Sequence, residues 1–363
     1  MMEQSNSGIW NLESLGWDSF FAQAFEPFAG RELMAARVAL QHRTHYIVFS
    51  EHGELKAEAA GKMLFHAEGM QDLPAVGDWV VIHPRPEEQA ATILEILPRR
   101  TKFSRKTAGR RTEEQIVASN VDVVFIVSGL DGDFNVRRLE RYLVLVTQSG
   151  ASPVIVLNKA DACANIEELK NEVQRVAGKT PIHITSALRD EGLEMILNNV
   201  KRGQTGALMG SSGVGKTTII NHLLGSDERK TEEVRETDSR GRHATTVREL
   251  ILLPSGGLLI DTPGMRELQL WGEVDGVEEV FDDIEELAGR CKFRDCSHEV
   301  EPGCAVREAL ESGSLDSDRY ESYQKLLREL AYHSRKSNEA EQRKEKERIK
   351  KIMTQYKKNR PRR

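Results

Sequence analysis

Between about residues 33 and 105, hydrophobic and polar residues alternate in short runs, and turn residues separate the runs. This pattern is typical of half-buried β-strands. The five runs are Ala36–Leu40, His45–Ser50, Glu54–Gly61, Asp78–Ile82 and Ala91–Leu97. So many short strands in one small segment predict a barrel. We expect an OB-fold, and the pattern leaves an SH3-type barrel open as the alternative.

After residue 113 the pattern changes to continuous apolar runs that alternate with helical stretches. The apolar runs are Val121–Val127, Val154–Leu157 and Leu258–Ile260, and helical periodicity marks Asn135–Ser149 and Ile166–Ala177. Strands that are apolar throughout are buried on both faces, as in a parallel sheet covered by helices. The pattern continues to about Trp271 and predicts an α/β domain.

Three further segments flank these two. Residues 1–32 are rich in aromatic residues and favour an amphipathic helix, residues 272–334 are acidic and helix-prone, and the C-terminal segment is basic. A length of 363 residues corresponds to about two or three domains. We therefore expect a multidomain α/β protein with a lead-in over 1–32, an OB-fold over 33–106, a parallel-sheet domain over 113–271, a helical domain over 272–334 and a tail over 335–363.

The composition, 39% hydrophobic and 30% charged, is that of a soluble protein with hydrophobic cores. No apolar run approaches the roughly eighteen residues that a membrane helix needs. The N-terminus also lacks the basic-then-apolar pattern of a signal peptide. We expect a monomer in the cytoplasm that makes no membrane contact.

The net charge of −6 conceals a strong asymmetry. Residues 335–363 hold thirteen Lys or Arg against four Glu, which gives +9 and leaves −15 for the rest of the chain. A second stretch, Arg99–Arg111, has seven basic residues and no acidic one. A solvated helix or solubilising tail is one interpretation of such a run. Because two separate stretches carry the same sign, we favour a phosphate-backbone partner.

The most specific motif is Gly210-Ser211-Ser212-Gly213-Val214-Gly215-Lys216-Thr217, which fits the phosphate-loop pattern GxxxxGK[ST]. It follows the apolar run Gly206–Met209 and opens a helix that includes Thr218. The glycines let backbone N–H groups and the helix N-terminus face bound phosphates. We expect Lys216 to reach the β- and γ-phosphates and Thr217 to place its hydroxyl on Mg²⁺, and we assign both to catalysis.

A base-recognition motif, Asn158-Lys159-Ala160-Asp161, ends the apolar run Val154–Leu157. The Asp161 carboxylate can accept hydrogen bonds from N1–H and the N2 amine of guanine, which adenine does not offer. The segment Thr185-Ser186-Ala187 ends another short strand, and we expect Ser186 and Ala187 to cap the base.

Two more elements complete a set for GTP. Asp261-Thr262-Pro263-Gly264 follows an apolar run, so Asp261 would hold Mg²⁺ through water and Gly264 would present its N–H to the γ-phosphate. Between this element and the phosphate loop lies Gly241-Arg242-His243-Ala244-Thr245-Thr246, whose threonines can complete the Mg²⁺ shell. Together the four motifs predict a GTPase with GTP or GDP and Mg²⁺ as ligands.

The order of the motifs is unusual. In ordinary GTPases the phosphate loop comes first and the base motif near the end, but here the base motifs precede the loop. A circular permutation gives the same sheet, because domain termini often lie close together. The phosphate-sensing segment then leads directly into the C-terminal region, so nucleotide state can move that region.

The residue after Gly264 is Met265, where many GTPases have a glutamine that orients water. A thioether cannot orient an attacking water, so intrinsic hydrolysis should be slow. His243 is the candidate catalytic substitute, against the alternative that it is merely a solvent-exposed loop residue.

Cys291, Cys296, His298 and Cys304 lie within fourteen residues. Three thiolates and one imidazole suit a closed, tetrahedral, structural zinc site. The alternative is three separate thiols. Cys163, far away in the sequence, is expected to be an ordinary buried cysteine.

These motifs, in this order, resemble the RsgA (YjeQ) family of circularly permuted, ribosome-associated GTPases over roughly residues 33 to 334. The resemblance implies an N-terminal OB-fold, a central GTPase and a C-terminal zinc domain. It also implies late maturation of the small ribosomal subunit, rRNA binding, ribosome-stimulated hydrolysis and nucleotide-dependent release. Family members usually read GRHTTT where this chain has Ala244, which leaves open whether Thr245 or Thr246 serves Mg²⁺.

Three other functions are compatible with parts of this sequence. Permuted GTPases of the large subunit typically lack both the zinc cluster and the barrel. A nucleic-acid-binding scaffold could hold GTP as a structural ligand, which multiple-turnover phosphate release would exclude. A metabolite kinase could use the phosphate loop, but the base motif argues against it.

Overall fold

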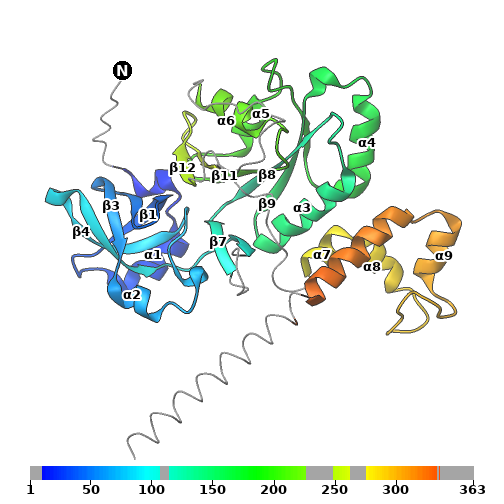
Figure 1. Ribbon diagram of the computed structural model, residues 1–363, viewed down its shortest axis with the longest axis horizontal. Helices are drawn as coiled ribbons and strands as arrows, with labels where there is room; N and C mark the ends of the chain where they lie inside the picture. Colours follow the sequence, from blue (N-terminus) through cyan, green and yellow to red (C-terminus); the bar gives the residue numbers. More distant parts are fainter. Residues whose placement is uncertain (1–9, 107–113, 226–247, 262–274, 333–334, 336–363) are drawn as a thin grey trace, which may run out of the picture. The chain divides into compact units, whose positions relative to one another are not determined.

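The computed structural model describes residues 10–106, 114–225, 248–261, 275–332 and 335 (Figure 1). The chain forms two compact units, Met1–Gln269 and Leu270–Arg363. Among the described residues, no helix is both long and apolar enough to span a bilayer.

The first unit begins with a five-stranded barrel. Its strands are β1 (Met34–Gln41), β2 (Tyr46–Ser50), β3 (Gly53–Ala59), β4 (Trp79–Arg85) and β5 (Ala90–Ile96). Strand β1 pairs with both β2 and β4, and β5 joins β4 to β3, so the sheet closes on itself. This closed order, with α2 (Gly61–His66) between β3 and β4, confirms the OB-fold and excludes the SH3-type alternative.

Alternation along the strands builds the barrel core. In β3 every second residue up to Ala57 is buried and the residues between are exposed. Burying each large aliphatic side chain in this way contributes about 1.5–3 kcal/mol. The core includes Ala36, Val38, Val48, Leu55, Val80, Ile82 and Ile93.

The same unit contains the predicted parallel sheet. Its strands are β8 (Val123–Gly129), β9 (Ser152–Asn158), β10 (Ile182–Ile184), β11 (Thr205–Met209), β12 (Glu249–Leu252) and β13 (Leu258–Asp261). Their order is β10-β9-β8-β11-β13-β12, and β12 runs antiparallel to its neighbour β13 while the other neighbouring pairs are parallel. The apolar runs predicted as buried strands are confirmed.

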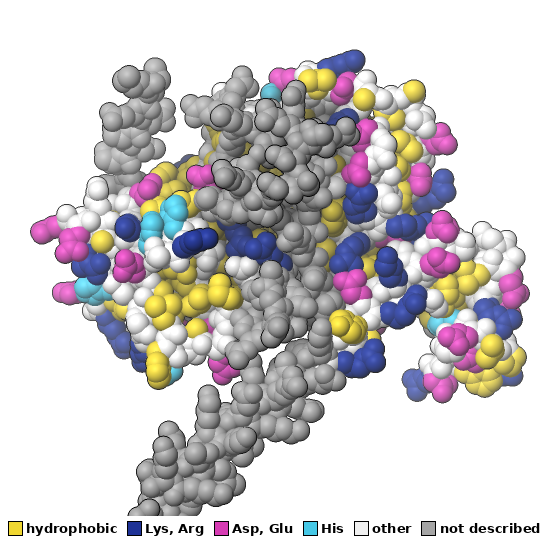
Figure 2. Space-filling view, in the orientation of Figure 1, with side chains coloured by type: hydrophobic (Ala, Val, Ile, Leu, Met, Phe, Trp, Pro, Cys, Tyr) yellow, Lys and Arg dark blue, Asp and Glu magenta, His cyan; other side chains and the backbone are white. Residues whose placement is uncertain are grey.

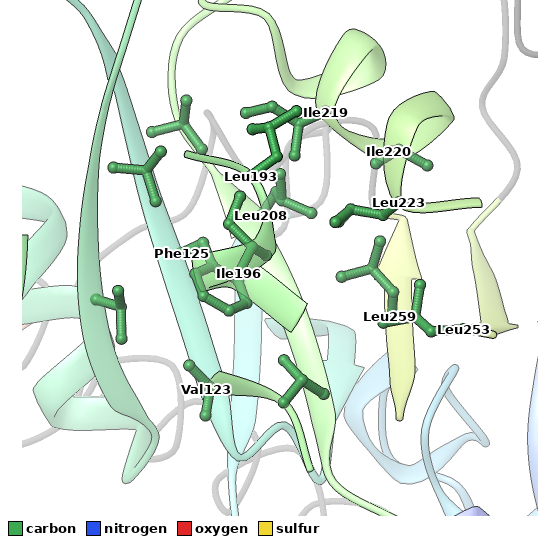
Figure 3. Packing of buried hydrophobic residues seen from close by; sticks show 14 of the residues in the cluster. Val123, Phe125, Leu193, Ile196, Leu208, Ile219, Ile220, Leu223, Leu253 and Leu259 are labelled. Atoms are coloured by element: carbon green, nitrogen blue, oxygen red, sulfur yellow. The ribbon is translucent and has the colours of Figure 1, made fainter. Parts of the chain in front are cut away.

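Helices cover both faces of this sheet (Figure 1). On one face, α5 (Glu194–Asn199) and α6 (Lys216–Leu224) pack on alternate residues of the strands. Figure 3 shows this cluster, with Phe125, Leu193, Ile196, Leu208, Ile219, Ile220, Leu223 and Leu259 labelled. Alternation turns the intervening strand residues to the opposite face. There α3 (Val136–Ser149) and α4 (Ile166–Ala177) cover them, as the helical periodicity predicted.

The barrel and the central sheet are joined directly. Strand β1 pairs with β12, with Leu40 opposite Glu249. The buried guanidinium of Arg37 in β1 donates to the carbonyl oxygen of Asn120 at 3.0 Å and to the hydroxyl of Thr205 at 2.8 Å. Burial lowers the pKa of Arg37 to about 10.

The aromatic lead-in packs on the barrel as short helices. They are η1 (Leu12–Leu15), α1 (Ser19–Phe25) and η2 (Glu26–Phe28). Trp17 meets Trp79 of β4 edge-on, with 4.8 Å between ring centroids, and Phe21 is fully buried beside them. The lead-in therefore contributes to the core of the first unit.

The basic stretch that begins at Arg99 is partly internal. Arg99 donates to both carboxylate oxygens of Asp78 at 2.7 Å, and Arg100 pairs with Asp18 and lies over the ring of Phe21. The following residues form β6 (Lys102–Lys106), which pairs with β7 (Glu114–Ser119) in a two-stranded ribbon. Arg99 and Arg100 are thus used to hold the fold.

The second unit is helical, as the sequence predicted. It contains α7 (Asp275–Val280), α8 (Asp282–Ala288), α9 (Ala305–Ser312) and a helix over 317–332. Phe281, Ile284 and Val306 are fully buried in it. Arg319 forms a bidentate pair with Asp283 at 2.7 and 2.9 Å and lies over the ring of Phe281.

Candidate nucleotide site and metal-ligand cluster

The phosphate-loop motif connects the end of β11 to the start of α6. Gly210 and Gly215 have φ of 155° and 99°. A Cβ at Gly210 would collide with the carbonyl oxygen of Val127, and one at Gly215 with the side-chain amide of Asn158. The loop therefore requires glycine at both positions. Among its other residues, Ser212 and Gly213 are exposed and Val214 is buried.

Lys216 lies inside the curve of this loop. Its ammonium donates to the carbonyl oxygens of Gly210 at 2.8 Å and Ser211 at 2.6 Å. Thr217, next to it, is exposed, and Thr218 is half-buried in the first turn of α6. The cation thus lies at the start of a helix, where backbone N–H groups favour an anion.

Asn158 connects the base motif to two other motifs. Its fully buried side chain donates to the carbonyl oxygen of Val214 at 2.8 Å. Its amide oxygen accepts from the backbone N–H of Ala187 at 2.9 Å and from the hydroxyl of Thr185 at 3.1 Å. Three segments far apart in sequence are therefore held together by one amide. The sequence also assigns Asn158 to the nucleotide, and its described contacts hold these three segments in place.

The remaining base-motif residues lie beside it. Ala160 and Asp161 form the short helix η5 (Ala160–Ala162), and Ser186 donates to the Asp161 carboxylate at 2.5 Å. Lys159 has a positive φ of 66° and pairs with Asp131 at 2.6 Å. Burial raises the pKa of Asp131, but the hydrogen bond and charge of Lys159 together with backbone hydrogen bonds outweigh burial, so the pKa lies below its ordinary value.

Asp261 ends β13, which neighbours the phosphate-loop strand β11, and its side chain is half-buried. Parallel strands present their carboxyl ends at one edge of a sheet, so Asp261 lies on the same edge as the loop. His243, Thr245, Thr246 and Gly264 lie outside the described residues.

The cysteine–histidine cluster is compact. One ligand atom from each of Cys291, Cys296, His298 and Cys304 lies within 4.8 Å of the others. The sulfur atoms of Cys291 and Cys304 are 3.9 Å apart, and they lie 3.6 and 3.4 Å from Nδ1 of His298. Tetrahedral zinc with its usual bond lengths requires about 3.8 Å between sulfurs and about 3.5 Å from sulfur to nitrogen. The donor set and its spacing fit that ion.

The neighbouring backbone also favours this role. Cys304 is the N-cap of α9, and its sulfur accepts from the N–H of Arg307 at 3.4 Å. A helix N-terminus stabilises negative charge, and zinc binds the thiolate form of cysteine. Cys163 lies elsewhere, in the first unit, and is half-buried, where the sequence suggested full burial.

Comparison with known proteins assigns this arrangement to a family. The sequence model of the RsgA GTPase family matches residues 96–271. The small ribosomal subunit biogenesis GTPase RsgA of Opitutus terrae is 47% identical over 350 residues, covering 94% of this chain and 95% of its own. The protein of the same name from Methanosarcina acetivorans is 42% identical and covers 95% and 92%. The chain belongs to the RsgA GTPase family.

Solved structures agree with this membership. YjeQ from Thermotoga maritima matches with a TM-score of 0.61 at 25% identity, over 82% of this chain and 99% of its own. YloQ, described as a circularly permuted GTPase, gives 0.57 at 26% identity over 82% and 95%. An ABC transporter model also matches residues 193–360. That range contains the phosphate loop but omits the base motif at 158–161, so it does not account for the whole site.

The strand order explains the permutation in this RsgA GTPase. Strands β9 and β10, which carry the base motifs, lie on one side of β8, and β11, which carries the phosphate loop, lies on the other. All of them are parallel, so their carboxyl ends meet at one edge whatever their order in the chain.

Sequence reasoning missed one part of this edge. The loop between β8 and α3 brings Asp131 to Lys159, and it brings Asp133 and Arg138 to Ser211 of the phosphate loop. The available signal was a pair of acidic residues directly after a buried strand, followed by an arginine in the first turn of a helix.

Proposed function

We propose that this chain is a GTPase that binds the small ribosomal subunit and hydrolyses GTP to GDP and phosphate during late maturation of that subunit. The observation that carries the proposal is the side chain of Asn158, which is bonded to both Val214 and Ala187. Through it, the residues expected to read guanine and those expected to bind phosphate share one edge of one sheet. The relatives described above are small ribosomal subunit biogenesis GTPases, and this supplies the partner.

Lys216 exchanges its hydrogen-bond partners when nucleotide binds. Its ammonium is bonded to two loop carbonyls, which are neutral acceptors. The β- and γ-phosphates are charged acceptors and form stronger hydrogen bonds with it, so they replace those carbonyls. Asp161 accepts from N1–H and the N2 amine of guanine, while Ser186 holds the carboxylate in place.

Hydrolysis needs two further functions. Thr217 and Asp261 would hold Mg²⁺, which neutralises phosphate charge when it is bound with the nucleotide, and Thr245 or Thr246 would complete its shell. His243 orients the attacking water, because Met265 cannot.

This role predicts that His243→Ala leaves GTP affinity near normal and lowers the hydrolysis rate. Nucleotide binding and phosphate release with ribosomes present measure the two effects. Turnover of the variant at the wild-type rate would remove His243 from catalysis.

One structural zinc is held by Cys291, Cys296, His298 and Cys304, and it stabilises the second unit.

The protein acts as a monomer in the cytoplasm, where it meets the small subunit and its rRNA. Binding is local, because most of the chain is acidic, whereas Arg99–Arg111 and the C-terminal tail are rich in basic residues. Figure 2 shows basic and acidic side chains interspersed among the described residues of the visible face.

The test is multiple-turnover phosphate release with no ribosomes, with purified small subunits and with purified large subunits. We expect slow release alone and faster release with small subunits.

Small subunits should also co-sediment with the protein better in a non-hydrolysable GTP analogue than in GDP. Binding should weaken steeply with salt, since phosphate contacts release counterions. A chain without residues 335–363 should show a shallower salt dependence and unchanged intrinsic hydrolysis.

Stimulation by large subunits alone would contradict the small-subunit role and leave the GTPase intact. Binding of GTP without turnover under any condition would instead support a scaffold that uses GTP as a structural ligand.

A further inference from the structure

A closed set of hydrogen bonds joins the phosphate loop to the helix after β8. Nη1 of Arg138 donates to Oγ of Ser211 and to Oδ2 of Asp133, both at 2.7 Å. The Ser211 hydroxyl donates to the same carboxylate oxygen at 2.5 Å. Ser211 is the second residue of the phosphate loop, and its partners lie 73 and 78 positions away in sequence. We call these three residues the Ser211 clamp.

Without these hydrogen bonds, the positive charge of Arg138 would be unfavourable at its place in the helix. It lies in the first turn of α3, where the helix dipole opposes a positive charge. The N-cap residue Asn135 accepts from the backbone N–H of Arg138 at 2.9 Å, which fixes where the side chain starts. Asp133 supplies the opposite charge. Hydrogen bonds from Arg138 and then Ser211 hold the pKa of Asp133 below its ordinary value, so it is ionised at neutral pH.

The clamp acts on the part of the loop that Lys216 must release. The ammonium of Lys216 is bonded to the carbonyl oxygens of Gly210 and Ser211, and bound phosphates would take their place. At the far end of the loop, Asn158 holds the carbonyl of Val214. Once Lys216 turns to the phosphates, the clamp still holds the first half of the loop.

We propose that Asp133 and Arg138 are positioning residues of the nucleotide site, which act through Ser211 to keep the phosphate loop ordered before nucleotide binds. A loop that is already ordered loses less conformational entropy on binding, so the clamp raises nucleotide affinity. Since the clamp contacts a loop side chain, it raises the affinity for GDP and GTP alike. This inference rests on the proposed GTPase function.

The test uses the full-length chain with Ser211→Ala, Asp133→Asn, Arg138→Gln and the double variant Ser211→Ala with Arg138→Gln. Arg175→Gln, an exposed arginine in α4, is the control for the loss of charge. For each we would measure the Kd of fluorescent GDP and of a fluorescent non-hydrolysable GTP analogue. Turnover at saturating GTP and the thermal midpoint are measured beside them.

Each single variant should weaken both nucleotides by about two- to fivefold, the loss expected for a partly exposed ion pair and its hydrogen bonds. Turnover at saturation should stay within about twofold for Asp133→Asn and Arg138→Gln, because neither residue belongs to the phosphate loop. The double variant should bind no more weakly than the weaker of its two parents, because both changes break one set of bonds. The control should match wild type.

Three results would overturn the inference. Unchanged affinity would make the clamp an ordinary surface ion pair. Additive losses in the double variant would show that Arg138 does not act through Ser211. A large fall in turnover with normal affinity would mean that Arg138 contacts the reacting phosphate and is catalytic. Failure of the wild-type chain to bind either nucleotide would reject the proposed function itself, and that measurement comes before any variant.

Discussion

The nucleotide site and the cysteine–histidine cluster differ in what holds their residues together. In the nucleotide site, Asn158 bonds to residues 29 and 56 positions away, and a covered sheet fixes each segment. In the cluster, the ligand contacts join residues 6 to 13 positions apart. Three of its four ligands are only half-buried. The first site is therefore built by the fold, whereas the second depends on the ion that its ligands share.

Substitutions in the nucleotide site should therefore affect binding, and substitutions in the cluster should affect folding. A side chain at the edge of the sheet can be lost while the buried strands keep the site's frame, so its loss should change binding. The ligands in the cluster are held together by the ion that they share, so loss of one of them should change the fold of the second unit.

The largest effect is expected from loss of the zinc ligand Cys304. Structural zinc contributes about 10–16 kcal/mol of binding free energy in small zinc-dependent folds. Cys304→Ser should abolish zinc binding and unfold the second unit, while intrinsic GTP hydrolysis continues. Elemental analysis should find one zinc in the wild-type chain and none in the variant, and limited proteolysis should cut the variant within Leu270–Arg363.

Cys163→Ser is the matched control, because Cys163 lies in the first unit and contacts Asn165 at 3.6 Å. It should keep one zinc and resist proteolysis. A wild-type chain without metal that nevertheless has a protease-resistant second unit would contradict the zinc assignment.

The next largest effect is expected in the nucleotide site, from loss of Lys216. Lys216→Ala should lower turnover by about a hundredfold or more, the usual loss when one donor to developing charge is removed. The zinc content and the thermal midpoint should stay at wild-type values, since the bonds of Lys216 go to two loop carbonyls. Phosphate release, elemental analysis and thermal unfolding together check this. A variant that unfolds would show that the loop is built around this lysine.

The sequence was most informative where one periodicity extended over a whole element. The barrel strands follow an alternation that only one register can bury, and α4 spans Ile166–Ala177, as its periodicity predicted. The phosphate loop was equally clear, because its glycines serve backbone positions that other residues cannot adopt.

Side-chain partners across the fold could not be read in this way. Arg99 belongs to a run that suggests an RNA contact, but its guanidinium binds Asp78, 21 positions earlier. The clamp on Ser211 joins residues more than seventy positions apart. Such pairs depend on which strands become neighbours, and neither periodicity nor a local motif encodes that. Asn158 was found by its motif, but its bonds to Val214 and Ala187 could not be predicted, for the same reason.

Loss of the Asn158 side chain should change both the stability of the first unit and its affinity for nucleotide. Asn158→Ala leaves the buried carbonyl of Val214 and the N–H of Ala187 without the amide that now satisfies them. We expect the first unit to lose about 2–4 kcal/mol of unfolding free energy, together with nucleotide affinity. Denaturant unfolding and nucleotide titration measure the two losses. An effect on affinity alone would mean that Asn158 acts only on the nucleotide.

The smallest effect is expected from Asp161→Asn, which should change only the choice of base. Asp161→Asn replaces an acceptor with an amide, so the donors N1–H and N2 of guanine lose their partner, whereas xanthine presents a carbonyl that the amide can meet. GTP affinity should fall about ten- to a hundredfold and XTP affinity should rise, as expected for one charged hydrogen-bond pair. The stability of the first unit should change little, because Ser186 can still donate to the amide oxygen. Titration of both proteins with GTP, XTP and ATP measures the switch. If GTP remains preferred by the variant, Asp161 does not read the base, and the guanine specificity must come from another residue at this edge of the sheet.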